Sequence, residues 1–557
     1  MKKMKKITAI LLALAMCLAV AACGGGTTPS AEPSTSAAPG NSPAPGASTA
    51  PSTSTAPGAG STLAPGEVIA APEGEDVKYA DLIDILIEVN CTAVDPFNPG
   101  ASGAGIQNMY VCVYDRLAIR VGEGIYEPEL ATSWDSADLQ TWTFKLRDDV
   151  SFHNGAKFTA QDVIDTVMLS RDAPGSYAFD AWRNVETITA IDEYTVQIVL
   201  DAVNVDFLFQ ISLPGASIVN KAARDADPVK GAWIGTGAFF VSDFVSSDYV
   251  TLDRNDSYWG TAPITKQLNF RHVPEMTART LMLQNGESQM CTSVSNEDMD
   301  LFVNDPDNFT IYAFPGNTIF TLIFNMNDKI TGDLNFRLAV AHALQRPDIT
   351  IVSAGEWANP ITDGTFWGDS TEFRNNDIPM LQYDPELSMK YLEESSYDGQ
   401  EVELMSALPL NNRMAEVIQE QLARVGINVK LFQTDGPTLQ STTVYGNDRM
   451  QMLSYVSAFS LSASTVRNVL YPGGVNNRAS YNNPAVNELL DKAPTIADPV
   501  ERGKLYKQVQ EIVSEEIPFI SCFCRVFSLV CDSGLGGIIV SPDQTHDFRG
   551  IFWILDD

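Results

Sequence analysis

A stretch of 43 residues near the start of the chain, Gly24–Gly66, most restricts what this sequence can fold into. Gly, Ala, Pro, Ser or Thr occupies 40 of its positions. Such side chains cannot bury a hydrophobic core, so we expect this stretch to be disordered. We place a flexible tether at residues 23–75. The globular part of the 557-residue chain must then lie within residues 76–557.

The segment before the tether has the pattern of an export signal. Lys2–Lys6 is basic, and the apolar run Ile7–Val20 is shorter than the ~20 residues that a membrane span needs. The string Val20–Cys23 (VAAC) resembles a bacterial lipobox. That resemblance implies removal of residues 1–22 and a lipid on Cys23, which would anchor the protein to the outer face of the cell membrane. The alternative is an ordinary secretory signal with an incidental cysteine.

The charge of the chain excludes several functions. It carries 36 Lys and Arg against 70 Asp and Glu, a net charge of −34, which argues against nucleic-acid binding. Its four histidines are scattered, so we expect no histidine-based metal site. We find no motif for a hydrolase or a nucleotide-binding enzyme, and we expect no enzyme activity and no cofactor. Composition alone leaves a two-carboxylate glycosidase open.

Hydrophobic periodicity predicts a mixed α/β chain without internal repeats. Alternating or apolar runs predict strands, and a 3.6-residue period predicts helices. A body of about 480 residues is too large for one core, which favours two lobes. The predicted strands are Leu82–Val89, Thr141–Leu146, two within Thr187–Leu200 around a turn at residues 190–193, Phe320–Phe324, Ile427–Phe432 and Ile520–Val530. The predicted helices are Thr159–Leu169 with Thr159 as N-cap, Asn335–Leu344, Leu410–Val425 ended by Gly426, and Glu501–Val513.

Several short motifs follow one another along the body in the order typical of one family. They are YEPELATSW (126–134), TFKLRDDVSFHNG (143–155), FTAQDV (158–163), GTGAF (235–239), RNDSYW (254–259), NFRLAVAHALQR (335–346), YNNPAVN (481–487) and EIPFI (516–520). Together they resemble the large solute-binding proteins of ABC importers, family 5, which includes oligopeptide-, dipeptide- and nickel-binding proteins.

The resemblance implies an α/β fold of the periplasmic-binding-protein type (type II, cluster C) with two lobes. Lobe I would comprise residues 76–316 and 522–557, with an extra subdomain at residues 105–230. Lobe II would comprise residues 317–521. Two crossing strands, near residues 318–325 and 520–526, would form the hinge between the lobes.

The same resemblance implies a function without chemistry of its own. The protein would be a monomer that binds a small solute, a peptide or an oligosaccharide, between its lobes. It would deliver this solute to an ABC permease in the membrane, whose ATPase supplies the energy. A solute sensor or surface adhesin with the same fold and no permease is the open alternative.

The ligand-binding candidates come from the loops that would face the space between the lobes. Peptide-binding members of the family carry an acidic residue in a WxxDYxDP-like loop. The matching stretch here has Val456 at the tryptophan position and Phe459 at the aspartate position. A buried ammonium needs a carboxylate partner, so this departure favours a neutral, hydroxyl-bearing ligand such as an oligosaccharide. The candidate residues are Trp357, Trp367, Tyr455, Ser457, Phe459, Ser460, Arg467 and Tyr471, each of which could instead belong to the core or the solvated surface.

Other motif residues favour structural roles. His153 ends a strand before a tight turn and is expected to be hydrogen-bonded rather than catalytic. Gly235–Gly237 predicts a close turn, and Tyr258 with Trp259 predicts packing. The six body cysteines could be buried thiols, could form a disulfide, or could hold a metal, and we favour buried thiols.

Overall fold

The computed structural model describes residues 62–63, 68–72, 77–98, 104–122, 124–295, 298–355, 357–364, 366–367, 372–407, 409–435, 438–439, 442, 450–455, 466–474, 476–541 and 545–555. The described residues belong to one compact unit, Pro51–Asp557. The predicted signal peptide, Cys23, Ser457, Phe459 and Ser460 lie outside them.

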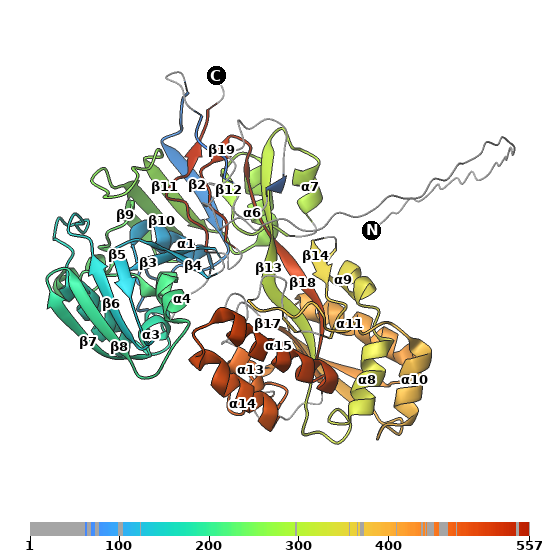
Figure 1. The fold of residues 1–557 in the computed structure, drawn as a ribbon. Helices are drawn as coiled ribbons and strands as arrows, with labels where there is room; N and C mark the ends of the chain where they lie inside the picture. The colour runs from blue at the N-terminus through green and yellow to red at the C-terminus, as the bar shows by residue number, and fades with distance from the viewer. Residues whose placement is uncertain are drawn as a thin grey trace, which may run out of the picture. The chain divides into compact units, whose positions relative to one another are not determined.

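A twelve-stranded mixed sheet forms the backbone of the fold (Figure 1). Its strands, in spatial order, are β16 (Val429–Thr434), β15 (Val402–Ala407), β17 (Met450–Tyr455), β13 (Phe309–Phe324), β18 (Phe519–Asp532), β12 (Met290–Cys291), β2 (Leu82–Ile87), β11 (Gln267–His272), β10 (Tyr249–Arg254) and β9 (Phe239–Val245). In addition, β1 (Thr62–Leu63) pairs with β13, and β14 (Ala358–Pro360) pairs with β18.

The side of this sheet from β12 to β9 belongs to lobe I. Its core surrounds β2 and α1, where Ile83, Ile85, Tyr110 and Phe270 are buried. The helices of this part are α1 (Ala104–Val113), α5 (Lys221–Ala226), α6 (Met276–Gln284) and α7 (Met299–Val303), and the C-terminal strands β19 (Leu535–Gly536) and β20 (Phe552–Trp553) form a small pair.

A separate antiparallel sheet forms the subdomain of lobe I. Trp142 and Phe144 of one strand point into its core, because the inward-facing residues of a strand recur with a period of two. Trp182 and Phe207 join this core from helices. The strand order is β5 (Ala131–Asp135), β6 (Thr141–Leu146), β8 (Thr195–Leu200) and β7 (Val185–Asp192), with helices α2 (Ala160–Arg171), α3 (Tyr177–Trp182) and α4 (Phe207–Ser212) and the hairpin of β3 (Ala118–Gly122) and β4 (Ile125–Pro128).

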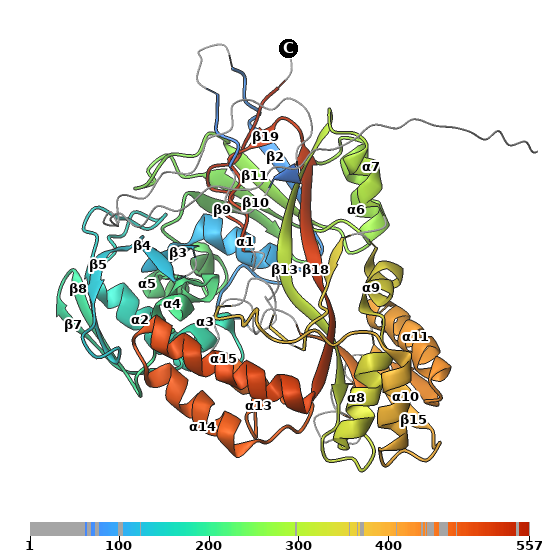
Figure 2. The same cartoon turned by 45° about the vertical axis from the view of Figure 1, so that its right-hand side comes forward.

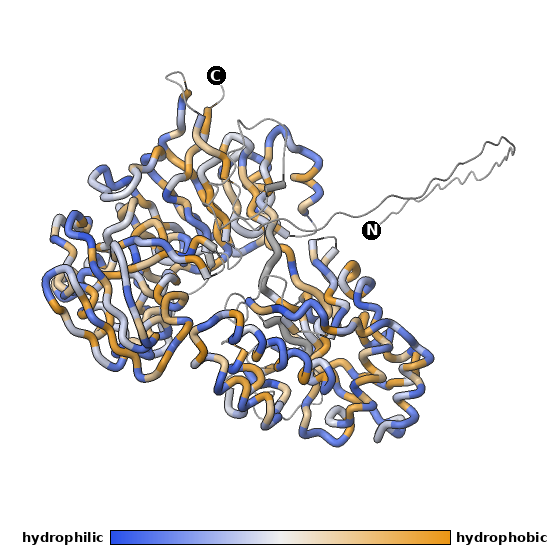
Figure 3. Tube along the Cα trace, in the orientation of Figure 1, coloured by the Kyte–Doolittle hydropathy of each residue, from blue (hydrophilic) through white to orange (hydrophobic). Residues whose placement is uncertain are grey.

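Lobe II contains β15, β16 and β17 with helices on both faces of the sheet (Figures 1 and 2). One core packs Phe336 of α8 and Met414 of α11 against Phe320 and Phe523. The other packs Tyr506 and Val509 of α15 around Trp367. Along the outer helices of this lobe, hydrophilic and hydrophobic residues alternate (Figure 3). The helices are α8 (Leu334–Ala343), α9 (Arg346–Ala354), α10 (Pro385–Glu393), α11 (Pro409–Arg424), α13 (Arg467–Leu470), α14 (Pro484–Lys492) and α15 (Pro499–Glu516).

The strands β13 and β18 pair with each other along most of their length and run through both lobes. Phe309 of β13 pairs with Asp532 at the lobe I end, and Ile323 pairs with Phe519 at the lobe II end. These strands cover all but residue 325 of the segments 318–325 and 520–526, on which the sequence places the hinge. The two connections between the lobes are thus long strands of the shared sheet.

Most predicted elements form close to their expected positions. Thr159 is the N-cap of α2, and Gly426 after α11 has φ of +89°, the left-handed conformation that favours glycine at a helix end. The predicted turn at residues 190–193 is displaced toward the C-terminus. Asp192 stays in β7 and its carboxylate accepts a hydrogen bond from the Tyr194 amide at 2.9 Å, so the turn forms two residues later, at Glu193 and Tyr194.

The tether ends earlier than its composition suggests. Thr62 and Leu63 form β1, which pairs in parallel with Ile311 and Tyr312 of β13. Ile69 is buried in the lobe I core, and its carbonyl accepts a hydrogen bond from Gly537. Composition could not show this. An isolated apolar residue in a Gly- and Pro-rich stretch becomes ordered only where the rest of the fold offers it a strand or a core to pack against.

Candidate functional site

Four strands meet at the level where the chain passes from one lobe to the other. Ile319 of β13 pairs with Tyr455 of β17 on one side and with Cys524 of β18 on the other. The next residue of β18, Arg525, pairs with Ala358 of β14. Neighbouring strands lie about 4.8 Å apart, so the backbones of Tyr455 and Arg525 are separated by roughly 10 Å. We call this region the crossing level.

A bulge marks the crossing level on β13. The pairing with β18 jumps from Pro315–Val526 to Ile319–Cys524, so the three residues 316–318 lie opposite the single residue Arg525 of β18. A bulge of this kind interrupts the ladder, bends the strand and increases its twist. The sheet is thus locally distorted where the two lobes join.

Two of the predicted ligand-binding residues come to the crossing level. Tyr455 is the last residue of β17. Trp357 immediately precedes β14, and its carbonyl accepts a hydrogen bond from the Val526 amide at 3.0 Å. The half-buried Trp357 ring packs against a small core of lobe I. The end of β17 and the start of β14, about 100 residues apart in sequence, therefore reach the same level of the sheet through the pairing of β13 and β18.

Three other candidates lie in lobe II, away from this level. Trp367 is fully buried in the core around α15, and its indole donates to the Glu372 carbonyl at 3.2 Å. Arg467 pairs with Asp491 at 2.5 Å and stacks on the Tyr471 ring, with its guanidinium carbon 3.5 Å from the ring centroid. Contact of these residues with a ligand stays a prediction.

Sequence reasoning missed two charged residues: Arg525 at the crossing level and Glu88, whose charge acts on Arg525. Arg525 is the one charged residue of the otherwise apolar or small run Ile520–Val530. A charge inside an apolar strand is costly unless it has a role, and this signal was available in the sequence. Glu88 follows β2, and its carboxylate accepts a hydrogen bond from the Thr292 hydroxyl at 3.1 Å.

A second concentration of charge lies deep in lobe I and is fully paired. Arg549 bridges the carboxylates of Glu129 and Asp547, each at 2.7 Å. Arg116 binds Glu129 from the other side at 3.1 Å. Burial opposes ionisation of Glu129, but the two guanidiniums outweigh it and hold the pKa of Glu129 below its usual range. A buried network satisfied in this way favours a structural role.

The carboxylate of Asp115 explains two of the sequence motifs. It accepts hydrogen bonds from the Thr236 hydroxyl at 2.9 Å, the Trp259 indole at 2.8 Å and the Tyr258 hydroxyl at 3.3 Å. Burial, and next the charge of Glu129, raise the pKa of Asp115 to about 6. Tyr258 and Trp259 thus pack against lobe I, as the sequence predicts. Through Asp115 they are hydrogen-bonded to Thr236 in the turn Gly235–Gly237, which we call the GTG turn.

His153 has the structural role that its sequence context predicts. Its Nδ1 accepts a hydrogen bond from the Gly235 amide at 3.2 Å, and its Nε2 lies 3.0 Å from the Gly237 carbonyl. The neutral ring with its proton on Nε2 satisfies both partners. Burial accordingly lowers the pKa of His153 to about 4. A Cβ on Gly237 would lie 2.4 Å from the Cys112 carbonyl oxygen, so only glycine fits this close approach.

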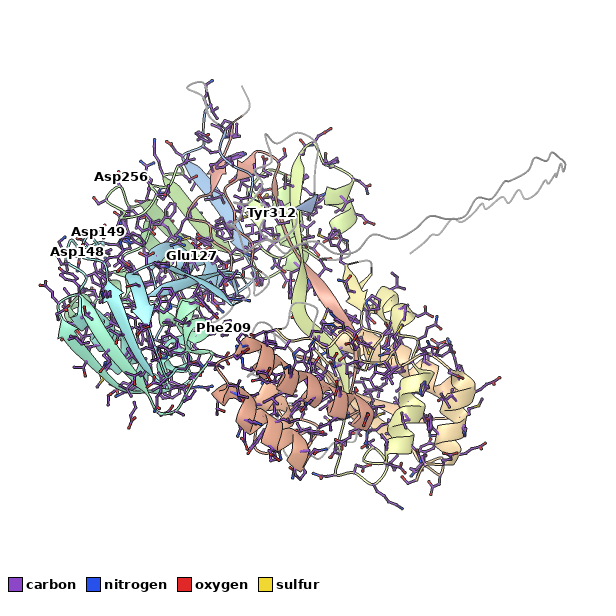
Figure 4. All side chains as sticks on the ribbon, in the orientation of Figure 1. Glu127, Asp148, Asp149, Phe209, Asp256 and Tyr312 are labelled. Carbon is purple, nitrogen blue, oxygen red and sulfur yellow. The ribbon has the colours of Figure 1, made fainter. Side chains whose placement is uncertain are left out.

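The subdomain presents charged residues at its surface. Glu127 of β4, Asp148 and Asp149 all belong to it, and Phe209 lies on α4 (Figure 4). Arg120 lies over the Phe209 ring at 5.8 Å. Asp149 pairs with Arg147 at 2.6 Å on the surface. Its carboxylate is therefore already engaged and is not available to bind a ligand.

The six body cysteines, Cys91, Cys112, Cys291, Cys522, Cys524 and Cys531, are buried, and none of them is in a disulfide. This outcome excludes the alternative of a disulfide among them. Within the described part of the chain, no cluster of three or more His, Cys, Asp or Glu could hold a metal ion. No helix of that part is both long and apolar enough to pass through a bilayer.

Two surface pockets lie away from the crossing level. One of about 470 Å³ is lined by Asp81, Asp256 and Lys266 of lobe I, and one of about 170 Å³ by Asn375, Ile378 and Glu511 of lobe II. None of the predicted ligand-binding residues lines either pocket. The register of the crossing strands, rather than these pockets, brings predicted residues together.

Comparisons with known proteins agree with this architecture. Residues 126–477 match the family described as bacterial extracellular solute-binding proteins, family 5. The dipeptide-binding protein of Escherichia coli K12 is 26% identical over 517 residues, covering 83% of this chain and 94% of that protein. The nickel-binding periplasmic protein of the same organism is 24% identical, covering 81% and 91%.

Solved structures share the fold at lower identity. HbpA2 from Haemophilus parasuis superposes with a TM-score of 0.76 at 22% identity, covering 85% of this chain and 100% of that one. The unliganded open form of the murein tripeptide-binding protein MppA has a TM-score of 0.74 at 21% identity, covering 87% and 99%.

The family match covers more than half of the chain, and the fold is the two-lobed one of this family. These proteins bind solutes and are not enzymes. This chain therefore belongs to the bacterial extracellular solute-binding proteins, family 5, the substrate-binding proteins that serve ABC importers of peptides and other solutes.

Proposed function

We propose that this chain is the lipid-anchored substrate-binding protein of one ABC importer. It captures a small solute, a peptide or an oligosaccharide, between its lobes and hands it to a membrane permease. The observation that carries this proposal is the family match over residues 126–477, together with two predicted ligand residues that come to the crossing level.

The proposed mechanism is closure around the solute. Lobe I (residues 76–316 and 522–557, with the subdomain at residues 105–230) and lobe II (residues 317–521) are joined by β13 and β18. A solute that contacts both lobes binds the closed state more tightly than the open state, and this difference in affinity shifts the population toward closure. The permease then recognises the closed form, and ATP is hydrolysed by its partner ATPase.

Solute binding is tested by calorimetry on the full chain in detergent. Small peptides and oligosaccharides are the probes, because the chain resembles proteins named for dipeptide and glutathione binding. A ligand at 100 times its Kd adds about 2.7 kcal/mol to the free energy of unfolding, so its melting temperature rises. If no member of either panel raised the melting temperature, the proposal would be wrong.

Lipid attachment is tested at Cys23. We expect cells fed radiolabelled palmitate to label the wild-type chain, and the mature protein to begin at residue 23. Cys23→Ser should lose the label. Cys17→Ser is the matched control, since Cys17 lies in the predicted signal peptide. Labelling of Cys23→Ser equal to wild type would contradict the anchor.

A further inference from the structure

Arg525 lies where β18 passes from the core of one lobe to that of the other. Residues two apart in a strand share a face, so Phe523, Arg525 and Phe527 point to the same side. Phe523 is buried in the lobe II core and stacks on Phe320, with ring centroids 4.7 Å apart. Phe527 packs against the lobe I core. Arg525 therefore occupies the position between the two cores.

The guanidinium of Arg525 has no polar partner among the described residues. Its Nε is buried without a hydrogen bond, and none of the ion pairs within 4.0 Å in that part of the chain includes it. Its contact is with the Phe527 ring, 5.4 Å from the ring centroid. Burial lowers the pKa of Arg525, as expected for a cation that is removed from water.

Two other buried arginines, Arg337 and Arg279, donate to backbone carbonyls. Arg337 donates to the Glu516 and Thr331 carbonyls, each at 3.0 Å. Arg279 donates to the Val273 carbonyl at 2.6 Å and to the Pro274 carbonyl at 3.0 Å. Both of these buried guanidiniums thus have backbone acceptors, and Arg525 differs from them.

Glu88 is the carboxylate whose charge acts on Arg525, but the two do not form an ion pair. The Thr292 hydroxyl instead donates to the Glu88 carboxylate at 3.1 Å. The fork of a guanidinium matches a carboxylate through two parallel N–H···O bonds. Since Glu88 already places one negative charge nearby, a monoanion fits this position better than a dianionic phosphate.

We infer that the solute carries a carboxylate, which binds the Arg525 guanidinium at the crossing level, close to Trp357 at the start of β14. This inference rests on the proposed function and names the chemical class of its substrate. It changes the expectation drawn from Phe459. Phe459 stands where peptide-binding relatives have an acidic residue, which argues against a solute with an amine. Arg525 favours a solute with a carboxylate. An acidic sugar fits both observations.

The test is capture of small solutes from yeast extract by the immobilised full chain, with identification by mass spectrometry. One portion of the extract is untreated, one is methyl-esterified to neutralise carboxylates, and one is treated with phosphatase. We expect the wild type to retain carboxylic solutes from the untreated and phosphatase-treated portions and to lose them after esterification. Arg525→Gln should retain roughly 10- to 100-fold less of these solutes, the range expected for a lost charge-assisted hydrogen bond.

Two further variants separate binding from folding. Arg525→Lys keeps the charge without the fork and should retain an intermediate amount. Arg424→Gln makes the same change of net charge on the exposed face of α11, where Arg424 pairs with Glu420 at 2.8 Å, and should behave as wild type. Melting temperatures without solute show whether each variant is folded.

Equal retention from the esterified portion, loss only after phosphatase treatment, or unchanged retention by a folded Arg525→Gln would each overturn the inference and leave the proposed function intact. If the wild type retained nothing from any portion, the proposed function would fail and this inference with it.

Discussion

His153 shows that a conspicuous motif residue can have a purely structural role. His153 stands in the most recognisable motif of the chain, yet both ring nitrogens are used to hold the GTG turn. Protonation of Nδ1 would place a second N–H against the Gly235 amide. The ring is therefore stable only in its neutral form, which makes His153 a sensor of acid in the folded state.

We expect the free energy of unfolding of His153→Gln to fall less steeply than that of the wild type as the pH is lowered. A histidine has a pKa near 6.5 when unfolded, against about 4 for His153 in the fold. Its stabilisation is complete above about pH 6.5 and is lost as the pH falls toward 4, by up to roughly 3 kcal/mol. Denaturant titrations from pH 7 to 4 measure this slope, with His342→Gln as control. Equal slopes for the wild type and His153→Gln would contradict the assignment.

The two tryptophan candidates should respond differently to truncation. Trp367→Ala removes a fully buried ring and should lower the free energy of unfolding by about 3–5 kcal/mol. Trp357→Ala removes a half-buried ring at the crossing level and should reduce solute retention more than stability. Urea melts and the capture assay distinguish the two effects. A stable Trp367→Ala that loses solute would place that ring in the binding site instead.

The ends of helices are often set by capping residues that can be recognised in the sequence. The predicted helix Glu501–Val513 is observed as α15, Pro499–Glu516. Its start is set by Asp498, whose carboxylate accepts from the Val500 amide at 2.8 Å and the Glu501 amide at 3.3 Å. Asp followed by Pro is a common N-cap and first-turn pair, so this boundary was readable from the sequence.

Removing that cap gives a prediction for α15. Asp498→Ala should lower the free energy of unfolding by about 1 kcal/mol, because two backbone amides lose their acceptor. Asp498→Ser keeps a capping oxygen and should lose less. Chemical denaturation measures both variants. Equal stability of Asp498→Ala and the wild type would show that the cap contributes nothing.

Across the molecule, the cysteines act as apolar side chains. All six body cysteines are buried thiols outside any disulfide, and burial raises the pKa of Cys91 to about 11 and that of Cys522 to about 12. A thiol that stays protonated reacts slowly with oxidants. The stability of the fold should therefore not depend on the redox state of its surroundings.

We expect a reducing agent to leave the melting temperature unchanged. Breaking a structural disulfide typically costs 2–5 kcal/mol, which would lower the melting temperature by several degrees. Scanning calorimetry with and without dithiothreitol makes the comparison. A clear drop on reduction would reveal a disulfide that the described cysteines do not form.

The sequence by itself determined the family, the α/β class, most strands and helices, and the structural role of His153, because these depend on local periodicity, turn chemistry and ordered motifs. Only the tertiary structure decided that Ile69 joins the core, that Trp367 is buried, and that the backbones of Tyr455, Trp357 and Arg525 reach the same level of the sheet. Strand register sets these outcomes. Pairing between segments hundreds of residues apart determines which side chains become neighbours, and no local pattern contains that information.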